Sequence, residues 1–509
     1  MVQRLVVLAG WLIDGSGAPA SSRVLLHIEN GRIVALEQVP MTWMPHAAEN
    51  YPGHAGAGVP GRANPGKPDS NRLRDRPADR SGTFFAAPPD LPTPAARPDQ
   101  GPAPGQAAPA PPFLDLSHCT ILPGLVDSHV HLFMSGTSDP EIRKAQREAS
   151  LAASRQVISG HLRRHRSCGV LAVRDGGDRA GHTLRVKLES LTAPQPPLLR
   201  SPGTAWHAHG RYGALIGRAP PREAALADSI ALFLREWSDR PPANAPARNA
   251  ATVNPGARHP SEGPQRSSHP VDHLKIVNSG LNSLARFGVE TPPQFPLDQL
   301  KAAVEVGRRQ GLKTMVHANG ELPVRIAIEA GCGSVEHGFF MGRDNLARLA
   351  ERQIFWVPTA VTMQAYTREP GANRRDPDVA RRNLDHQLEQ LRLARELGVP
   401  VAAGTDSGSL GVHHGESLRE EVGLLMLAGF PLEAAVRCAS WNGARLLGVE
   451  EDLGLLGPGR PATFVAVEAD PSALPAALAR VAAVFVRGQS FAIPSVPCML
   501  GTPPNRGAP

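Results

Sequence analysis

The sequence lacks any apolar run long enough to span a bilayer, so it predicts no transmembrane helix and no membrane partner. It has only five cysteines in 509 residues, and they are scattered, odd in number and without the spacing of a zinc ribbon. This usage argues against a disulfide framework and predicts a reducing, cytoplasmic compartment. The short apolar start has no clear cleavage site, and we interpret it as a strand of the mature protein.

The sequence also lacks a long basic run interleaved with aromatic residues. The net charge is +7, but aromatic residues make up only 5% of the chain. Nucleic-acid binding proteins usually concentrate their positive charge on one surface and add aromatic side chains for stacking. The composition therefore gives little support to a nucleic-acid partner and leaves a small-molecule substrate as the expectation.

Proline is abundant, with 51 residues, and two stretches are especially rich in it. Residues 41–112 and 240–270 contain few aliphatic side chains, so they cannot bury enough apolar surface to offset the entropy lost on ordering. We interpret both as flexible insertions, with a partner-binding role as the alternative. Residues 496–509 are expected to form a flexible tail.

Outside these stretches, strand-like and helix-like patterns alternate. Eight strand candidates separated by amphipathic helical segments predict an α/β fold, a closed (β/α)8 TIM barrel over 113–448. The candidates cover 121–131, 168–177, 198–206, 272–280, 312–320, 332–338, 353–360 and 399–408. Short strands at the two chain ends, 1–40 and 449–495, predict a composite β-sandwich.

The stretch "PGLVDSHVHL" (123–132) falls on the first barrel strand. Successive side chains of a strand point to opposite faces, so His129 and His131 would project side by side. Two imidazoles that converge from a buried strand suit a transition metal. Two polar residues at a strand end, each hydrogen-bonded to the backbone, would give the same pattern. The two histidines alone therefore do not distinguish a metal site from this structural alternative.

A parallel barrel collects functional groups at the C-terminal ends of its strands. These strand ends add Lys275, His317, His337 and Asp406 to the two histidines. Each alone has a structural explanation, such as a lysine that reaches solvent, a histidine that bonds a carbonyl group or an aspartate in a turn. Six such residues at one barrel mouth by chance are improbable, and together they predict a metal site.

Several motifs carry a resemblance to a known family. They are "ILPGLVDSHVHL", "KIVNSG", "VHANGE", "SVEHG" and "GTDSG", with a C-terminal stretch that begins "HHGESLREEVGLLMLAG". In these motifs the chain resembles the amidohydrolase superfamily of metal-dependent hydrolases, and within it the prolidase-like and imidazolonepropionase-related groups. The resemblance covers most of the chain outside the insertions. It implies a (β/α)8 barrel beside a small β-sandwich built from both termini.

By position, the resemblance implies a binuclear metal site, usually zinc. One ion would be held by His129, His131 and Asp406, and the second by His317 and His337. Dimers or larger assemblies are common among such barrels, so the resemblance also raises the expectation of a homo-oligomer. The family's "Gly-Lys-x-Ala-Asp" pattern appears here as "GRPAT" (459–463). That departure lies in the predicted sandwich, away from the metal ligands.

The resemblance further implies that Lys275 bridges both ions as a carbamate, since an ammonium has no free lone pair for a metal. Two ions that share a water would convert it to a metal-bridging hydroxide, with Asp406 as the catalytic residue that moves its proton to the leaving nitrogen. The loop 206–218 should overhang the pocket. Its residues His209 and Tyr212 are candidate substrate contacts, with ordinary solvent-facing positions as the alternative.

These features predict a hydrolase of an amide-type C–N bond in a dipeptide, an N-acyl amino acid or another carboxamide. A deaminase or a cyclic-amidine or imidazolone hydrolase on the same scaffold is the first alternative. Those relatives often use one metal and lack the bridging lysine, so Lys275 favours the amide hydrolase. A non-enzymatic barrel scaffold is the second alternative, although such a protein would be expected to have lost some of the six residues.

Overall fold

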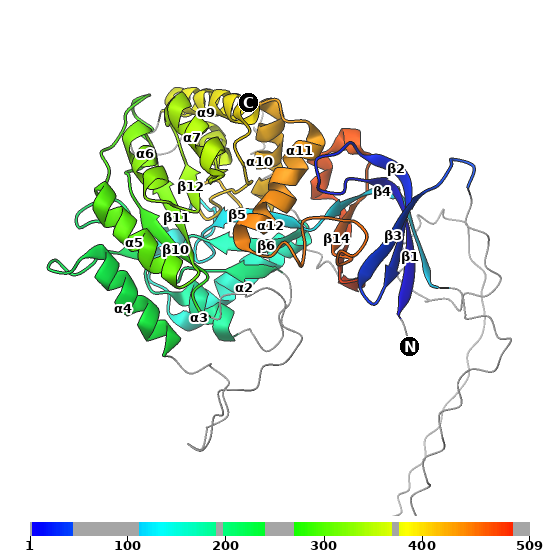
Figure 1. Cartoon of the computed structure of the whole chain (residues 1–509), viewed down its shortest axis with the longest axis horizontal. Coiled ribbons are helices and arrows are strands. Elements are labelled where there is room, and N and C mark those ends of the chain that lie inside the picture. Colours follow the sequence, from blue (N-terminus) through cyan, green and yellow to red (C-terminus); the bar gives the residue numbers. More distant parts are fainter. Residues whose placement is uncertain (1–2, 44–110, 190–196, 240–268, 369–375, 492–509) are drawn as a thin grey trace, which may run out of the picture. The chain divides into compact units, whose positions relative to one another are not determined.

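The computed structural model describes residues 3–43, 111–189, 197–239, 269–368 and 376–491. These residues form one seven-stranded sheet, two parallel sheets and the helices that cover them (Figure 1). Nearly all of the two predicted insertions, and the whole of 496–509, lie outside the described residues. Their flexibility therefore stays a prediction.

The seven-stranded sheet, here called the terminal sheet, joins both ends of the described chain in the order β16-β15-β14-β4-β1-β2-β3. Its strands are β1 (Arg4–Leu12), β2 (Ser21–Glu29), β3 (Arg32–Gln38), β4 (Phe113–Pro123), β14 (Phe464–Val467), β15 (Val481–Val486) and β16 (Gln489–Phe491). β4 pairs parallel with β1 and antiparallel with β14. The terminal sheet is therefore built from both ends, and β4 belongs to it rather than to the barrel region.

The predicted strand 121–131 is two strands, which separate at Gly124. β4 ends at Pro123, and β5 (Leu125–Val130) begins the first parallel sheet. A Cβ at Gly124 would lie 2.7 Å from Cδ1 of Leu171. Glycine thus lets the chain pass tightly from the terminal sheet into the parallel sheet.

Two parallel sheets make up the rest of the β structure. The first has the order β5-β6-β7, and the second β13-β12-β11-β10-β8-β9. Their remaining strands are β6 (Val170–Asp175), β7 (Leu198–Arg200), β8 (Ala205–Trp206), β9 (Gly217–Arg218), β10 (His273–Val277), β11 (Lys313–Ala318), β12 (Ser334–His337) and β13 (Phe355–Val357). No closed barrel is assigned among these described strands. The arrangement is α/β, with a TIM-barrel-like domain beside the terminal sheet.

Helices follow most of the parallel strands, whereas β7, β8 and β9 succeed one another without a helix between them. The helices are α1 (Pro140–Arg147), α2 (Leu151–Ser167), α3 (His182–Glu189), α4 (Leu226–Ser238), α5 (Leu297–Arg309), α6 (Glu321–Glu329), α7 (Gly342–Arg352), α8 (Val361–Arg368), α9 (Pro377–Leu397), α10 (Glu416–Leu427), α11 (Leu432–Arg437) and α12 (Gly443–Leu447). In Figure 1, α5, α6 and α7 lie outside β10, β11 and β12. No helix within the described ranges is both long and apolar enough to cross a bilayer.

The long helix α9 shows how local sequence sets these elements. Asp376 precedes it, and its side chain accepts a hydrogen bond from the backbone N–H of Asp378. Pro377 occupies the first helical position, where its missing N–H has no intrahelical partner to lose. Gly398 ends the helix in the left-handed conformation, with φ 72°. Both ends of α9 thus carry residue types that typically begin or end a helix and that can be recognised in the sequence.

Candidate metal centre

The structure brings the six side chains singled out in the sequence into one cluster. His129 lies on β5 and His131 directly after it, and both Nε2 atoms face the Asp406 carboxylate. Asp406 Oδ1 is 3.3 Å from His131 Nε2 and 3.6 Å from His129 Nε2. One nitrogen or oxygen atom from each of these three residues lies within 4.8 Å of the others. Among the described residues, this is the one group of three or more His, Cys, Asp or Glu with such spacing.

The other three side chains extend this cluster. The Nζ atom of Lys275, on β10, is 3.5 Å from His129 Nε2. The ring centroids of His337 and His129 are 5.0 Å apart, and those of His337 and His317 are 4.5 Å apart. The residues thus come from β5, β10, β11, β12 and the segment 399–408. They meet at the carboxyl ends of the parallel strands.

Hydrogen bonds to the backbone fix the tautomers of two of the histidines. His131 Nδ1 donates to the carbonyl of Gly177 (3.3 Å), and His317 Nε2 donates to the carbonyl of Gly280 (3.1 Å). A carbonyl oxygen can only accept, so each bonded nitrogen carries the ring proton. This leaves His131 Nε2 and His317 Nδ1 with free lone pairs, as a metal ligand requires.

Two of the cluster residues hold backbone conformations that are rare outside glycine. Asp406 has φ 57° and His337 has φ 67°. The backbone of His337 is held in place, because its carbonyl accepts hydrogen bonds from Gln387 Nε2 (2.6 Å) and Trp356 Nε1 (3.0 Å). Its Nδ1 contacts the Thr359 hydroxyl at 2.8 Å. Strained conformations that the surroundings fix in this way concentrate at functional sites.

Burial sets the protonation of the cluster. His129 is fully buried, and burial together with the nearby Lys275 amine lowers its pKa well below the ordinary value. Burial also lowers the pKa of Lys275 to about 8, although Glu336 and Asp406 oppose this. For Asp406, burial would raise the pKa, but contacts with His131 and His129 outweigh it and hold the pKa below the ordinary range. Burial likewise lowers the pKa values of His317 and His337, so these two imidazoles and that of His129 are neutral and Asp406 is an anion, the forms that bind cations.

Sequence reasoning missed two residues next to the cluster. Glu336 and Arg174 are almost fully buried and form an ion pair, with 2.8 Å between Arg174 Nη2 and Glu336 Oε1. The other Glu336 oxygen is 2.9 Å from His129 Nδ1. A signal was available, since each charged residue lies within a strand of the predicted parallel barrel, where a buried charge needs a partner.

Asp127, which the sequence analysis did not choose as a ligand, lies fully buried beneath the cluster. Its carboxylate accepts hydrogen bonds from Thr405 Oγ1 (2.7 Å) and Thr405 N (3.0 Å). Burial raises the pKa of Asp127 to about 7. Because Thr405 directly precedes Asp406, this contact fastens the segment that carries Asp406 to β5.

The two candidate substrate contacts have different surroundings. The ring centroid of Tyr212 lies 5.3 Å from that of His317, and 36% of the residue is exposed. Gln294 Nε2 donates to the Tyr212 carbonyl (2.8 Å) and so ties this loop to the segment after β10. His209 Nε2 instead contacts the carbonyl of Pro220. Tyr212 thus borders the cluster, and a substrate role for either residue stays a prediction.

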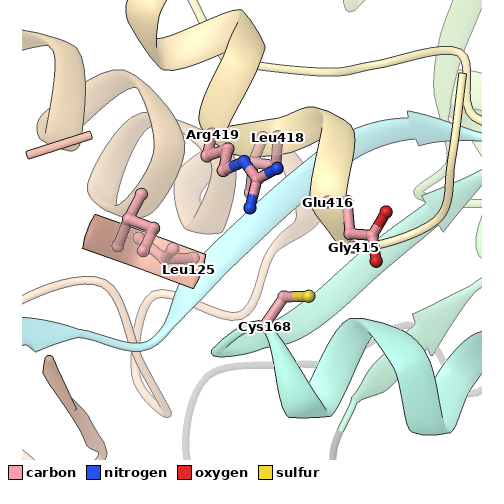
Figure 2. A pocket seen from close by; sticks show the side chains of 7 residues that line it. Leu125, Cys168, Gly415, Glu416, Leu418 and Arg419 are labelled. Carbon is pink, nitrogen blue, oxygen red and sulfur yellow. The ribbon is translucent and has the colours of Figure 1, made fainter. Parts of the chain in front are cut away.

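Figure 2 shows a small hollow elsewhere in the molecule. It lies between Leu125, the Cys168 thiol at the end of α2, and Glu416 and Arg419 of α10. None of the six cluster residues lines it.

Burial raises the pKa of Cys168 to about 11, so its thiol is protonated and unreactive near neutral pH. The described cysteines 119, 168, 332 and 438 form no disulfide.

Comparison with known sequences places this geometry in context. The chain is 26% identical over 374 residues to an uncharacterised protein of Mycobacterium tuberculosis, a match that spans 73% of this chain and 85% of that protein. It is 28% identical over 201 residues to ochratoxinase of Aspergillus niger, across 39% of this chain and 41% of that enzyme. It is 26% identical over 370 residues to imidazolonepropionase of Rhodococcus jostii, across 70% and 76% of the two chains.

Solved structures show the same fold. A crystal structure of a Xaa-Pro dipeptidase with bound methionine superposes with a TM-score of 0.65 at 20% identity, and the match covers 96% of this chain and all of that one. The family model described as "Amidohydrolase family" matches residues 120–491, which include all six cluster residues. The resemblance recognised in the sequence is therefore confirmed: the chain belongs to the amidohydrolase family and is a hydrolase that acts on carbon–nitrogen bonds.

Proposed function

We propose that the protein is a binuclear, metal-dependent hydrolase of an amide-type C–N bond in a dipeptide, an N-acyl amino acid or another carboxamide. The observation that carries this proposal is the position of Lys275. The Lys275 side chain is buried within the cluster, and its Nζ atom is 3.5 Å from His129 Nε2. A carbamate on a lysine in this place would offer one oxygen to each of two ions, which supports a binuclear centre.

The donor atoms fit divalent metal ions. His129, His131 and Asp406 would hold one ion, and His317 and His337 the second. Neutral imidazoles with one carboxylate suit zinc, which we propose as the metal. The second pair has no carboxylate of its own among these six residues. Carboxylation of Lys275 would supply one, because its neutral amine can add to CO2 with loss of a proton.

The lowered pKa of Lys275 supports this modification. With a pKa of about 8, a sizeable fraction of the amine is neutral near neutral pH, whereas an ordinary lysine is almost entirely protonated. Only the neutral amine has the lone pair that attacks CO2. The carbamate would then carry two oxygen ligands, one for each ion.

When bound, the two ions would lower the pKa of a shared water to near neutrality and polarise the scissile carbonyl group. Asp406 would accept the proton of that water and pass it to the leaving nitrogen. The side chain is suited to this, since it is ionised and 17% exposed at the open side of the cluster. Tyr212, whose ring packs against that of His317, and His209 on the same loop would contact the substrate.

The proposal includes closure of the parallel strands into a (β/α)8 barrel. The segment 399–408 bridges both sheets, because Val401 pairs with Trp356 of β13 and Ser407 with Val130 of β5. On the opposite side, the segment 198–206 contributes β7 to the first sheet and β8 to the second. These eight segments in sequence order support a closed ring.

A hydrolase of a cyclic amidine or imidazolone ring is the second candidate, supported by the match to imidazolonepropionase of Rhodococcus jostii. Metal content and substrate range separate the two. We expect the purified full-length protein to contain about two ions per chain and to cleave dipeptides or N-acyl amino acids in a chelator-sensitive manner that zinc restores. About one ion with hydrolysis of imidazolone rings would favour the second candidate. Chelator-insensitive amide hydrolysis would contradict both.

Two broader expectations accompany this proposal. The chain is proposed to work in the cytoplasm, as its cysteine usage predicts, and to act on a small-molecule substrate. A homo-oligomer is a further expectation, and size-exclusion chromatography with light scattering of the purified protein tests it.

A further inference from the structure

We propose that Glu336 is a positioning residue, which orients His129 and fixes its tautomer for metal binding, and that Arg174 holds Glu336 in place for this task. The proposal rests on the proposed function, since it concerns how the metal ligands are prepared. It goes beyond it by giving a role to a buried ion pair whose carboxylate is hydrogen-bonded to His129.

The contacts of Glu336 are divided between its two oxygens. Oε2 accepts a hydrogen bond from His129 Nδ1 (2.9 Å). Oε1 accepts from Arg174 Nη2 (2.8 Å) and from the Ser334 hydroxyl. Ser334 and Glu336 are two residues apart on β12, so their side chains share a face. Each oxygen therefore has its own partner, and the carboxylate cannot rotate without breaking one of them.

Arg174 is fixed as firmly as Glu336. Its Nε donates to the carbonyl of Ser128 (2.8 Å), directly before His129 in the chain, and its Nη1 donates to Ser334 Oγ (3.0 Å). The guanidinium therefore connects β5, β6 and β12 at one point. It holds both the backbone that carries His129 and the carboxylate that His129 contacts.

This geometry determines which nitrogen of His129 is free. A carboxylate only accepts, so the ring proton lies on Nδ1 and the Nε2 lone pair faces Asp406 and Lys275. Metal-binding histidines commonly have their other nitrogen fixed in this way, and removal of the partner typically weakens metal affinity 10- to 100-fold. Fold stability alone does not require such a pair, because apolar residues often replace buried ion pairs without loss.

The Glu336→Gln variant separates positioning from packing. Arg174 donates to the Oε1 position, so the amide oxygen of glutamine must face Arg174 and its NH2 group must face His129. That NH2 group donates to Nδ1 and moves the ring proton to Nε2, where it blocks the metal. We expect affinity for the first zinc or cobalt ion, measured by competition with a chelator, to fall about 10- to 100-fold. The metal-free variant should also melt at a lower temperature, because Arg174 keeps its buried charge without an anionic partner. Affinity is therefore compared at a temperature at which both proteins are folded.

Two matched variants serve as controls. Ser334→Ala removes a hydrogen bond to Oε1 but leaves the contact with His129, so affinity should stay within about threefold of wild type. Glu421→Gln changes another fully buried carboxyl group, which accepts only from the backbone N–H groups of Ala360 and Val361. This variant measures how much stability and metal affinity change when a buried carboxyl group away from the cluster becomes an amide.

The outcomes distinguish this inference from the proposed function. If wild-type protein binds no metal, the proposed function fails. If wild type binds metal and Glu336→Gln binds it equally well, the positioning role fails. Should Glu336→Gln not fold, a crystal structure of zinc-loaded wild type decides. We expect ligation through His129 Nε2 with Nδ1 bonded to Glu336, and ligation through Nδ1 would overturn the inference.

Discussion

Asp406 is the residue whose replacement tests the proposed chemistry most directly. Asp406→Asn keeps the side-chain shape and one ligand oxygen but cannot accept a proton from water. We expect kcat to fall about 10²- to 10⁴-fold, the range that general acid–base groups contribute. Metal content, measured by elemental analysis, should remain substantial because the five other ligands are unchanged. A variant with near wild-type kcat would remove Asp406 from the proton-transfer role.

Lys275 tests whether the centre holds two ions. Lys275→Met preserves the length and the apolar stem but can form no carbamate, so metal content should fall from about two ions per chain to about one. Lys313→Met is the matched control, because Lys313 lies at the start of β11, where its Nζ donates to the Arg445 carbonyl. That variant should retain about two ions. Equal metal content in both variants would contradict the bridging role.

At this scale, the sequence predicted which six residues form the cluster, but not the backbone conformations and buried partners that hold them. His129 and His131 were predictable because strand periodicity places residues two apart on one face. The left-handed backbone of His337 and Asp406 was not predictable, since neither residue is a glycine. Glu336 and Arg174 were also missed: each is visible as a charged residue within a strand, but their pairing joins β12 to β6 and no local pattern encodes it.

The helix α2 provides a test of pH dependence, through His161. His161 Nδ1 donates to the carbonyl of Leu132 (2.8 Å), and its ring stacks on His414 with centroids 3.9 Å apart. Burial lowers the pKa of His161 to about 4, with a smaller contribution from Arg164 in the same direction. The His161 side chain therefore takes up a proton near pH 6.5 in the unfolded chain but only near pH 4 in the folded protein.

It follows that His161 contributes to stability above pH 6.5, and that this contribution is lost as the pH falls towards 4. The loss amounts to roughly 3 kcal/mol at most. We expect the melting temperature of the metal-free wild type to fall more steeply over this interval than that of His161→Gln, whose amide can still donate to Leu132. Parallel curves for the two proteins would show that His161 does not contribute to acid sensitivity.

Strand boundaries were harder to predict than strand existence. The third candidate, 198–206, is interrupted between β7 and β8, where Gly203 has φ 74°. The eighth candidate, 399–408, forms only isolated bridges at Val401 and Ser407. Both segments begin with apolar residues that favour a strand, but contacts with neighbouring strands set where each strand stops. The spacing of apolar residues and the amino-acid composition of a segment carry no information about those contacts.

For the whole molecule, the insertion after β3 offers a clean test. The described chain stops at Trp43 and resumes at 111, and the ring centroids of Trp43 and Phe113 are only 6.3 Å apart. A short Gly/Ser linker can therefore replace residues 44–110 without moving β3 or β4. We expect the shortened protein to retain its melting temperature, its metal content and kcat/KM within about twofold.

The substitution Trp43→Ser in the shortened protein is a useful control. It removes the Trp43–Phe113 ring contact but leaves the linker length unchanged. Loss of activity in the shortened protein with a normal melting temperature would give the insertion a functional role. Loss of folding would show that the terminal sheet depends on it.

The terminal sheet has a consequence for biosynthesis. β4 is flanked by β1 from one end of the chain and by β14 from the other, so one side of β4 stays open until almost the whole polypeptide has left the ribosome. A product that terminates before Phe464 would expose the edge of β4 permanently, and an open strand edge recruits other chains. Late nonsense mutations should accordingly yield aggregated, protease-cleared protein instead of a shorter active enzyme.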